Sequence, residues 1–192
     1  MEARANDINI LENYKVANPE ERFEIMFAHY SFFPKVIRKL EKKTQFKIKA
    51  EREYLRSHNR GELGVRVQTS NISSPTEDEA IDNIEIEEAF KTGEINSSLL
   101  KGIDNAVQYE EDIRITRLMR MDYELLEEMI EDLEDEETKI MKEYLVNKRF
   151  MKEIAVEFGM SYETVKRKIR IIKEDLLEEI IECLEMNCRE EV

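Results

Sequence analysis

Apolar side chains recur every three or four residues along most of this chain, the spacing that places them on one face of an α-helix. This pattern predicts an all-α fold. The expected helices cover residues 19–30, 34–56, 76–93, 97–119, 122–134, 136–147 and 150–158, followed by a basic helix over 162–173 and an apolar stripe over 175–186. No apolar run approaches the roughly 20 residues that cross a bilayer, which predicts a protein without a membrane partner.

Residues that favour helix starts stand at several of these boundaries. Asn18 precedes Pro19 and two glutamates, which predicts a capped N-terminus with acidic residues in its first turn. Thr76 and Glu79 have the spacing of a capping box. Pro34 is expected at the start of the next helix and not inside one, because proline breaks a helix interior. Local residue choice therefore agrees with the periodicity.

The helical pattern is interrupted between residues 58 and 74. Gly61 and Gly64 flank a short alternation of apolar and polar residues, but a lone strand would lack a partner, so an extended loop is expected. The sequence thereby divides into an N-terminal helical region with a basic helix (1–60), a linker or extended loop (61–75), an acidic helical middle region (76–134) and a C-terminal domain (135–192).

The most specific pattern is FMKEIAVEFGMSYETVKRKIRIIK, residues 150–173. Ile154 and Ala155 face a core from its first helix, and Gly159 stands where a chain leaving a helix adopts a left-handed conformation. Ser161 suits the start of the second helix because its hydroxyl can accept a hydrogen bond from a free amide. Helix, turn and basic helix in this order are typical of the helix-turn-helix, whose second helix enters the DNA major groove. An ordinary helical hairpin with a solvated basic face is the alternative.

The second helix of this motif provides candidate DNA contacts. Its apolar residues share one face, and in a helix-turn-helix the N-terminal turn of this helix faces the base edges. Arg167 can donate two hydrogen bonds to guanine, and Glu163 can accept from the amine of cytosine. The predicted base contacts are Tyr162, Glu163 and Arg167, and the predicted phosphate contacts are Ser161, Lys166, Lys168, Arg170, Lys148, Arg149 and Lys152.

Residues 152–169, KEIAVEFGMSYETVKRKI, resemble the C-terminal domain of sigma factors (region 4) and its relatives. The shared pattern is a Glu-Ile-Ala helix, a Gly-apolar-Ser turn and Thr-Val-Lys opening the second helix, and the resemblance covers residues 136–180. Upstream, SSPTEDEAI (73–81) is similar to a segment of phage late-transcription regulators of the RinA/ArpU type. Those proteins pair an N-terminal helical region with a sigma-like helix-turn-helix. The resemblance thus implies a three-helix DNA-binding domain and a phage or prophage origin.

Two positions stand apart within this resemblance. Phe150 occupies the place where the family usually has a Ser or Thr helix cap, so the first helix is expected to begin differently, with Asn147 as the candidate cap. Tyr162 stands at a position that varies among related proteins, which leaves the target sequence open.

The formal net charge of −14 is unusual for a DNA-binding protein, but the charges are grouped. Residues 35–60 and 148–173 are rich in Lys and Arg, whereas 77–94, 122–137 and 174–191 are rich in Asp and Glu. DNA responds to the local potential within about 8–10 Å and not to the total charge. The basic helix over 35–56 is therefore either a second nucleic-acid contact or a face balanced by the acidic helices of its own chain, and the balance within the chain is favoured.

Residues typical of catalytic and metal sites are scarce. His29 and His58 lack the spacing of a metal motif, and Cys183 and Cys188 offer no zinc quartet. The sequence has no glycine-rich phosphate loop and no Asp-x-Asp-x-Asp-Gly calcium loop. We therefore expect no enzyme activity, no cofactor and no metal, and two reduced thiols indicate a cytoplasmic protein.

The sequence thus favours a sequence-specific DNA-binding transcriptional regulator with double-stranded DNA as its partner. A sigma-like factor acting through RNA polymerase, a DNA-packaging protein of the small-terminase kind and a protein-interaction module remain alternatives. The apolar stripe over 175–186 fits either a homodimer contact or packing within the chain, and packing is favoured.

Overall fold

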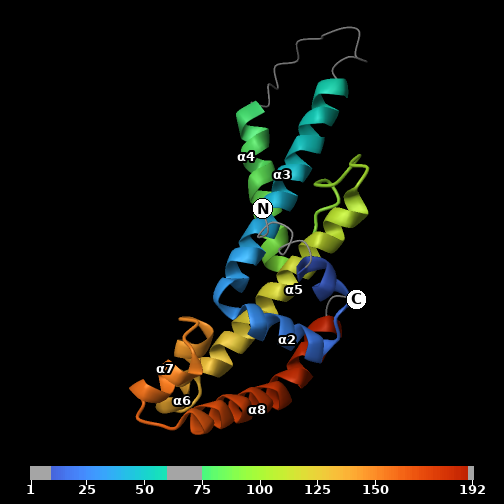
Figure 1. Cartoon of the computed structure of the whole chain (residues 1–192). Coiled ribbons are helices and arrows are strands. Elements are labelled where there is room, and N and C mark those ends of the chain that lie inside the picture. Colours follow the sequence, from blue (N-terminus) through green and yellow to red (C-terminus); the bar gives the residue numbers. More distant parts are fainter. Residues whose placement is uncertain (1–9, 60–74, 190–192) are drawn as a thin grey trace. The chain divides into compact units, whose positions relative to one another are not determined.

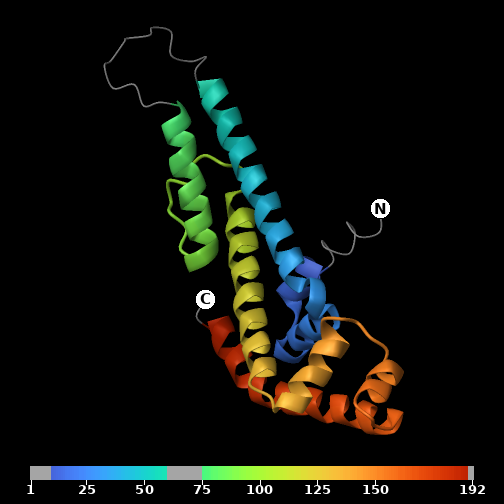
Figure 2. The same cartoon turned by 90° about the vertical axis from the view of Figure 1, so that its left-hand side faces the viewer.

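The computed structural model describes residues 10–59 and 75–189, and every regular element among them is helical. Residues 10–16 are helical, followed by α2 (Pro19–His29), the short 3-10 helix η1 (Tyr30–Phe32), α3 (Phe33–Asn59), α4 (Pro75–Thr92), α5 (Ala106–Glu131), α6 (Asp135–Leu145), α7 (Met151–Glu157) and α8 (Tyr162–Arg189). Figures 1 and 2 show these helices from two directions. The prediction of an all-α fold is confirmed for the described residues.

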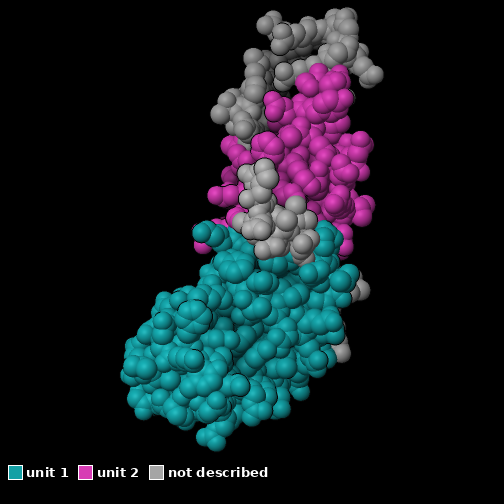
Figure 3. All heavy atoms as spheres, in the orientation of Figure 1, with its two compact units in different colours: residues 1–37, 118–192 teal, residues 38–117 magenta. Residues whose placement is uncertain are grey.

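The chain forms two compact units, which Figure 3 colours separately. Unit 1 comprises residues 1–37 and 118–192, and unit 2 comprises residues 38–117. This grouping differs from the four consecutive segments expected from the sequence, because the boundaries between the units fall inside α3 and α5. The expected linker over 61–75 lies outside the described residues except for Pro75.

Several helix boundaries lie where the local sequence predicts them. The Asn18 side chain accepts from the Glu21 amide (2.9 Å), and the Glu21 carboxylate accepts from the Asn18 amide (3.0 Å). Pro34 lies in the first turn of α3, and α4 ends just before Gly93, whose φ of 76° suits glycine. The expected capping box at Thr76 lies outside the residues whose side chains are described.

The two helices expected over 97–119 and 122–134 are largely one helix. Residues 97–102 form turns, and α5 begins at Ala106 and continues without interruption to Glu131. The expected break near Asp122 was wrong, because the sequence there has no glycine or proline. The Asp122 carboxylate binds Arg22 instead of capping a helix.

Unit 2 has a core formed by α3, α4, α5 and the turns that precede α5. Its residues without exposed surface are Ile48, Ile86, Leu99 and Ile113. Leu40 and Thr44 of α3 are buried as well, so the inner stripe of the basic helix is the one that its spacing predicts.

Unit 1 is organised around α8. Helices α2, α6 and α7 pack against α8. Val165, Ile169 and Ile172 are buried in its first half, and Leu176 and Ile180 are buried further along. The apolar stripe over 175–186 therefore lies in the core of its own chain, which is the arrangement the sequence favours.

Candidate nucleic-acid interface

Short-range hydrogen bonds shape the turn between α7 and α8. The Phe158 amide donates to the Ile154 carbonyl (3.0 Å), and the Met160 amide donates to the Ala155 carbonyl (2.9 Å), which closes the end of α7. Gly159 between them has a φ of 64°, the left-handed conformation predicted for it. A Cβ atom there would meet nothing within 4 Å, so the backbone conformation and not the available space favours glycine.

The start of α7 is capped by a carboxylate. The Phe150 amide donates to the Glu153 carboxylate (3.2 Å), and the Glu153 amide donates to the Phe150 carbonyl (2.8 Å). Asn147, the expected cap, donates its side-chain amide to Glu143 (3.0 Å) instead, so that expectation was wrong. Glu153 thus satisfies the first amide of the segment without a Ser or Thr, and the Phe150 side chain is left 76% exposed.

Ser161 caps α8 as predicted, because its hydroxyl accepts a hydrogen bond from the Thr164 amide (3.1 Å). Behind this cap, Val165 is buried together with Ile154 and Ala155 of α7. Helix α6 packs against both α7 and α8. The inner residues of these helices hold α8 so that its opposite side faces solvent.

That opposite side of α8 carries charged residues. Glu163, Lys166, Arg167 and Arg170 are all exposed, and their spacing places them along one side of the helix. They border a pocket of about 610 Å³. The pocket is lined by Glu24, Phe27, Ala28, Tyr144, Met151, Glu163, Lys166, Arg167, Ile169, Arg170 and Lys173. Four cations and two carboxylates thus surround an apolar and aromatic floor.

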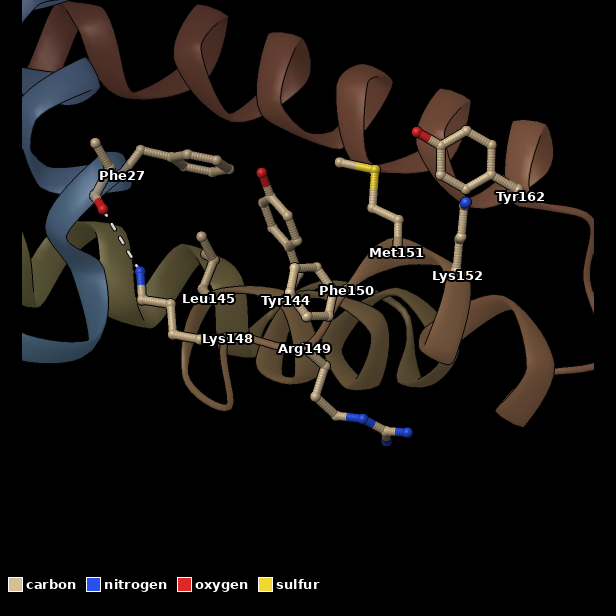
Figure 4. Close-up of a pocket in the computed structure, with 10 residues that line it drawn as sticks. Phe27, Tyr144, Leu145, Lys148, Arg149, Phe150, Met151, Lys152 and Tyr162 are labelled. Carbon is tan, nitrogen blue, oxygen red and sulfur yellow. Dashed lines mark hydrogen bonds between the residues drawn. The ribbon is translucent and has the colours of Figure 1, made fainter.

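A second pocket, of about 590 Å³, shares Phe27, Ala28, Tyr144 and Met151 with the first and is drawn in Figure 4. Figure 4 shows the Lys152 side chain beside the Tyr162 ring, while Lys148 extends toward α2 and donates to the Ala28 carbonyl (3.5 Å). Predicted contacts from three segments of the chain, namely Lys148, Lys152 and Tyr162, therefore border one pocket.

Two of the predicted phosphate contacts bind carboxylates of their own chain. Arg149 binds Glu143 (3.1 Å) and Glu157, and its hydrogen bond to Glu157 is the main reason that its pKa is raised. Figure 4 shows the Arg149 guanidinium directed away from the other labelled side chains. Lys168 binds Glu136 of α6 (2.7 Å), and that hydrogen bond is the main reason that the Lys168 pKa is raised. These two cations join the helices of unit 1.

Other predicted contacts remain available to an anion. Lys152, Lys166 and Arg167 have no hydrogen-bond or ion-pair partner within residues 10–59 and 75–189. Arg170 approaches Glu174, one turn further along α8, at 3.9 Å, and both side chains are well exposed. An exposed pair at that distance contributes little, so Arg170 also remains accessible to an anionic partner.

The contribution of α2 was not predicted from the sequence. Glu24 of α2 binds Lys173 of α8 (2.7 Å), and the Lys173 ammonium lies 5.2 Å from the centroid of the Phe27 ring. These contacts place α2 beside the charged side of α8. Because 149 residues separate Glu24 from Lys173, no local pattern indicates their proximity.

Within the described part of the chain, no group of three or more His, Cys, Asp or Glu side chains is placed to hold a metal ion. None of the described helices is both long and apolar enough to cross a membrane. Comparisons with protein-family models, curated proteins and solved structures found no match to this chain.

Proposed function

We propose that this protein is a sequence-specific, DNA-binding transcriptional regulator that reads the major groove of double-stranded DNA with residues 162–173 of α8. The main support for the proposal is the exposed, charged side of α8. The glycine turn and the buried inner face of the helix keep this side directed toward solvent. Val165 and Ile169 anchor the helix, while Lys166 and Arg167 reach solvent. DNA-binding helix-turn-helix proteins present their second helix in this way.

Within this proposal, α6, α7 and α8 form a three-helix domain of the sigma factor region 4 kind. Support comes from the resemblance over residues 136–180, which covers nearly all of α6, α7 and the first part of α8. Further support comes from the left-handed Gly159 and the Ser161 cap at the positions that the resemblance assigns to the turn. The phage-regulator resemblance extends the proposal to a late-transcription regulator of the RinA/ArpU type.

The proposed base contacts are Tyr162, Glu163 and Arg167, which lie in the first turns of α8. Arg167 has no competing carboxylate partner among the described residues, so its guanidinium can donate two hydrogen bonds to guanine. Glu163 can accept from a cytosine amine, and a good contact of this kind contributes about 1–3 kcal/mol of discrimination against the wrong base.

The proposed phosphate contacts fall into two groups. Lys152, Lys166 and Arg170 are exposed and can bind phosphates directly. Lys148, Arg149 and Lys168 must first release the Ala28 carbonyl or a glutamate, so their net contributions are smaller. Ser161 caps α8, and its role at the DNA is to hold the first turn of the helix toward the backbone.

Selection of binding sites from a random pool of DNA duplexes, with the full chain as bait, tests the proposal. We expect one enriched motif, and we expect Arg167→Ala to broaden it. Lys139→Ala, at an exposed lysine of α6, is the matched control and leaves the motif unchanged. Absence of any enriched motif at low salt would overturn the proposal.

The same enriched duplex separates the alternatives that the sequence leaves open. A regulator binds its site alone, whereas a sigma-like factor requires core RNA polymerase for a stable promoter complex. A packaging protein of the small-terminase kind forms a ring, which a mass measurement of the native protein in solution detects.

A further inference from the structure

We propose that helix α3 carries a second, sequence-independent surface for the phosphate backbone of duplex DNA. The surface is a basic stripe formed by Arg38, Lys42 and Lys49 in unit 2. The inference deepens the proposed function and rests on it for the identity of the polyanion. Its evidence comes from unit 2 alone.

Six cations of α3 divide into two sets according to their contacts. Arg52 and Arg56 bind Asp82 of α4 at 2.7 and 2.6 Å, and Arg52 also donates to the Leu99 carbonyl (2.6 Å). Lys47 lies 5.8 Å from the centroid of the Tyr109 ring. These cations stabilise unit 2 itself, which is the balance within one chain that the charge blocks suggest for part of this helix.

The basic stripe lies on a different side of α3. Arg38 and Lys42 are exposed, Lys49 is half-buried, and none of the three has a hydrogen-bond or ion-pair partner in the described part of the chain. Their separations of four and seven residues keep them in one row along the helix. At 1.5 Å per residue the row extends over about 16 Å, long enough to follow several consecutive phosphates of one strand.

None of the acidic residues of α3 forms an ion pair with this row among the described residues, although Glu41 lies three residues from Arg38. Glu51 accepts hydrogen bonds from Asn105 (2.9 Å) and from the Tyr109 hydroxyl, on the side of α3 that faces the rest of unit 2. Glu53 lies one turn beyond Lys49 and marks the end of the row. Uncompensated cations in a row are costly to keep together without an anionic partner, and a nucleic-acid backbone provides one.

An exposed aromatic ring stands beside the row. Phe46 is 73% exposed and lies three or four residues from Lys42, Lys43 and Lys49. Along a DNA strand, charged phosphates alternate with apolar deoxyribose, so a ring flanked by lysines matches that alternation. An acidic protein surface is the competing partner, and there the buried aromatic ring would dominate the binding energy.

The test measures binding of the full chain to a fluorescent duplex of arbitrary sequence by anisotropy, between 50 and 200 mM salt. Lys42→Ala/Lys49→Ala is the test variant, and its helix content is checked by circular dichroism. We expect weaker binding and a salt slope lower by about 1.8 units, because each phosphate contact contributes about 0.9. Lys91→Ala/Lys101→Ala removes the same charge from exposed sites elsewhere in unit 2 and is the matched control.

A test variant that binds like its control overturns the inference. Phe46→Ala distinguishes DNA from an acidic protein surface as the partner. If the partner is the DNA backbone, this variant loses less affinity for the duplex than the lysine variant does. A larger loss, together with an unchanged salt slope, also overturns the assignment to DNA.

The outcome for α3 is independent of the outcome for α8. If Arg167→Ala broadens the selected motif while the lysine variant binds duplex DNA like its control, the proposed function stands and this inference fails. If the lysine variant lowers the salt slope while no motif is enriched, the α3 surface stands and the proposed reading by α8 fails.

Discussion

Arg22 of α2 donates to the carboxylate of Asp122 in α5 at 2.8 Å, and the two side chains are only 1% and 0% exposed. The Tyr14 hydroxyl (2.7 Å) and the Asn187 side-chain amide (2.9 Å) donate to the same carboxylate. Arg22 also donates to the Leu184 carbonyl (2.5 Å). One buried ion pair thus joins the start of the described chain, α2, α5 and the end of α8 within unit 1.

Asp122→Ala is expected to lower the free energy of unfolding by about 3–5 kcal/mol, because it leaves the Arg22 charge buried without a counterion. Urea unfolding followed by circular dichroism measures the loss. Replacing both partners, as Arg22→Leu/Asp122→Leu, is expected to recover most of the stability, since no buried charge remains. Equal losses in the single and double variants would show that the ion pair is not the cause.

Gly159→Ala is expected to destabilise the protein by about 1–2 kcal/mol, because an alanine at positive φ crowds its own backbone. The added methyl group meets no neighbouring atom, so the effect is purely conformational. Gly159→Asn is the matched control and should cost less, since asparagine tolerates the left-handed region. Thermal unfolding of the parent and of the two variants measures these differences. An alanine variant as stable as the parent would contradict the assigned turn.

Arg167→Ala and Arg170→Ala are expected to affect DNA binding in different ways. Loss of Arg167 should cost roughly 1–3 kcal/mol on the selected site and relax the preference at one base pair. Loss of Arg170 should weaken all duplexes alike and reduce the salt slope by about one unit. Anisotropy titrations on selected and scrambled duplexes measure both. If both variants bind as the parent does, the base-reading segment is misassigned.

Lys166 and Lys168 are two residues apart, but within the described part of the chain only Lys168 binds a glutamate. We therefore expect Lys166→Ala to lower the salt slope of DNA binding more than Lys168→Ala does, because Lys168 must exchange Glu136 for a phosphate. Glu136→Gln should narrow the difference by releasing Lys168. The same binding titrations test this order, and the reverse order would contradict it.

Protonation of His29 is expected to make the free energy of unfolding depend on pH. Partial burial, and secondarily the charge of Lys148, lower the His29 pKa below 6.5 in the folded protein. As the pH falls, the unfolded chain therefore binds a proton at His29 before the folded protein does. The free energy of unfolding accordingly decreases below about pH 6.5, and this decrease ends below the pKa of His29 in the folded protein. His29→Gln should flatten that part of the curve in thermal unfolding between pH 5 and pH 7.5. An identical curve for the variant would exclude His29 as the source.

Local sequence was sufficient for features whose causes lie within a few residues. The Asn18 cap, the left-handed Gly159 and the Ser161 cap follow from residue types and immediate neighbours. The buried stripe of α8 follows from spacing for the same reason, since helix geometry fixes which residues share a face.

Two other local expectations were wrong. Asp122 was expected to begin a new helix, but α5 continues through it, and the Asp122 carboxylate binds Arg22, 100 residues away in sequence. Asn147 was expected to cap α7, but its side chain binds Glu143 and the cap is provided by Glu153. A polar side chain with several possible partners binds the one that packing brings within reach. The spacing of apolar residues does not indicate which partner that is.

Residue spacing and residue type were sufficient to predict that the described chain is helical, where most of its helices begin, and which residues of 150–173 face inward or outward. The packing of unit 1 brings α2 beside the charged side of α8, through Glu24 and Lys173. Packing also pairs Arg149 and Lys168 with glutamates, while Lys166 and Arg167 face solvent without a hydrogen-bond or ion-pair partner among the described residues. The physical reason is that charge neutralisation depends on distance in space, which a chain sets only after its helices have packed.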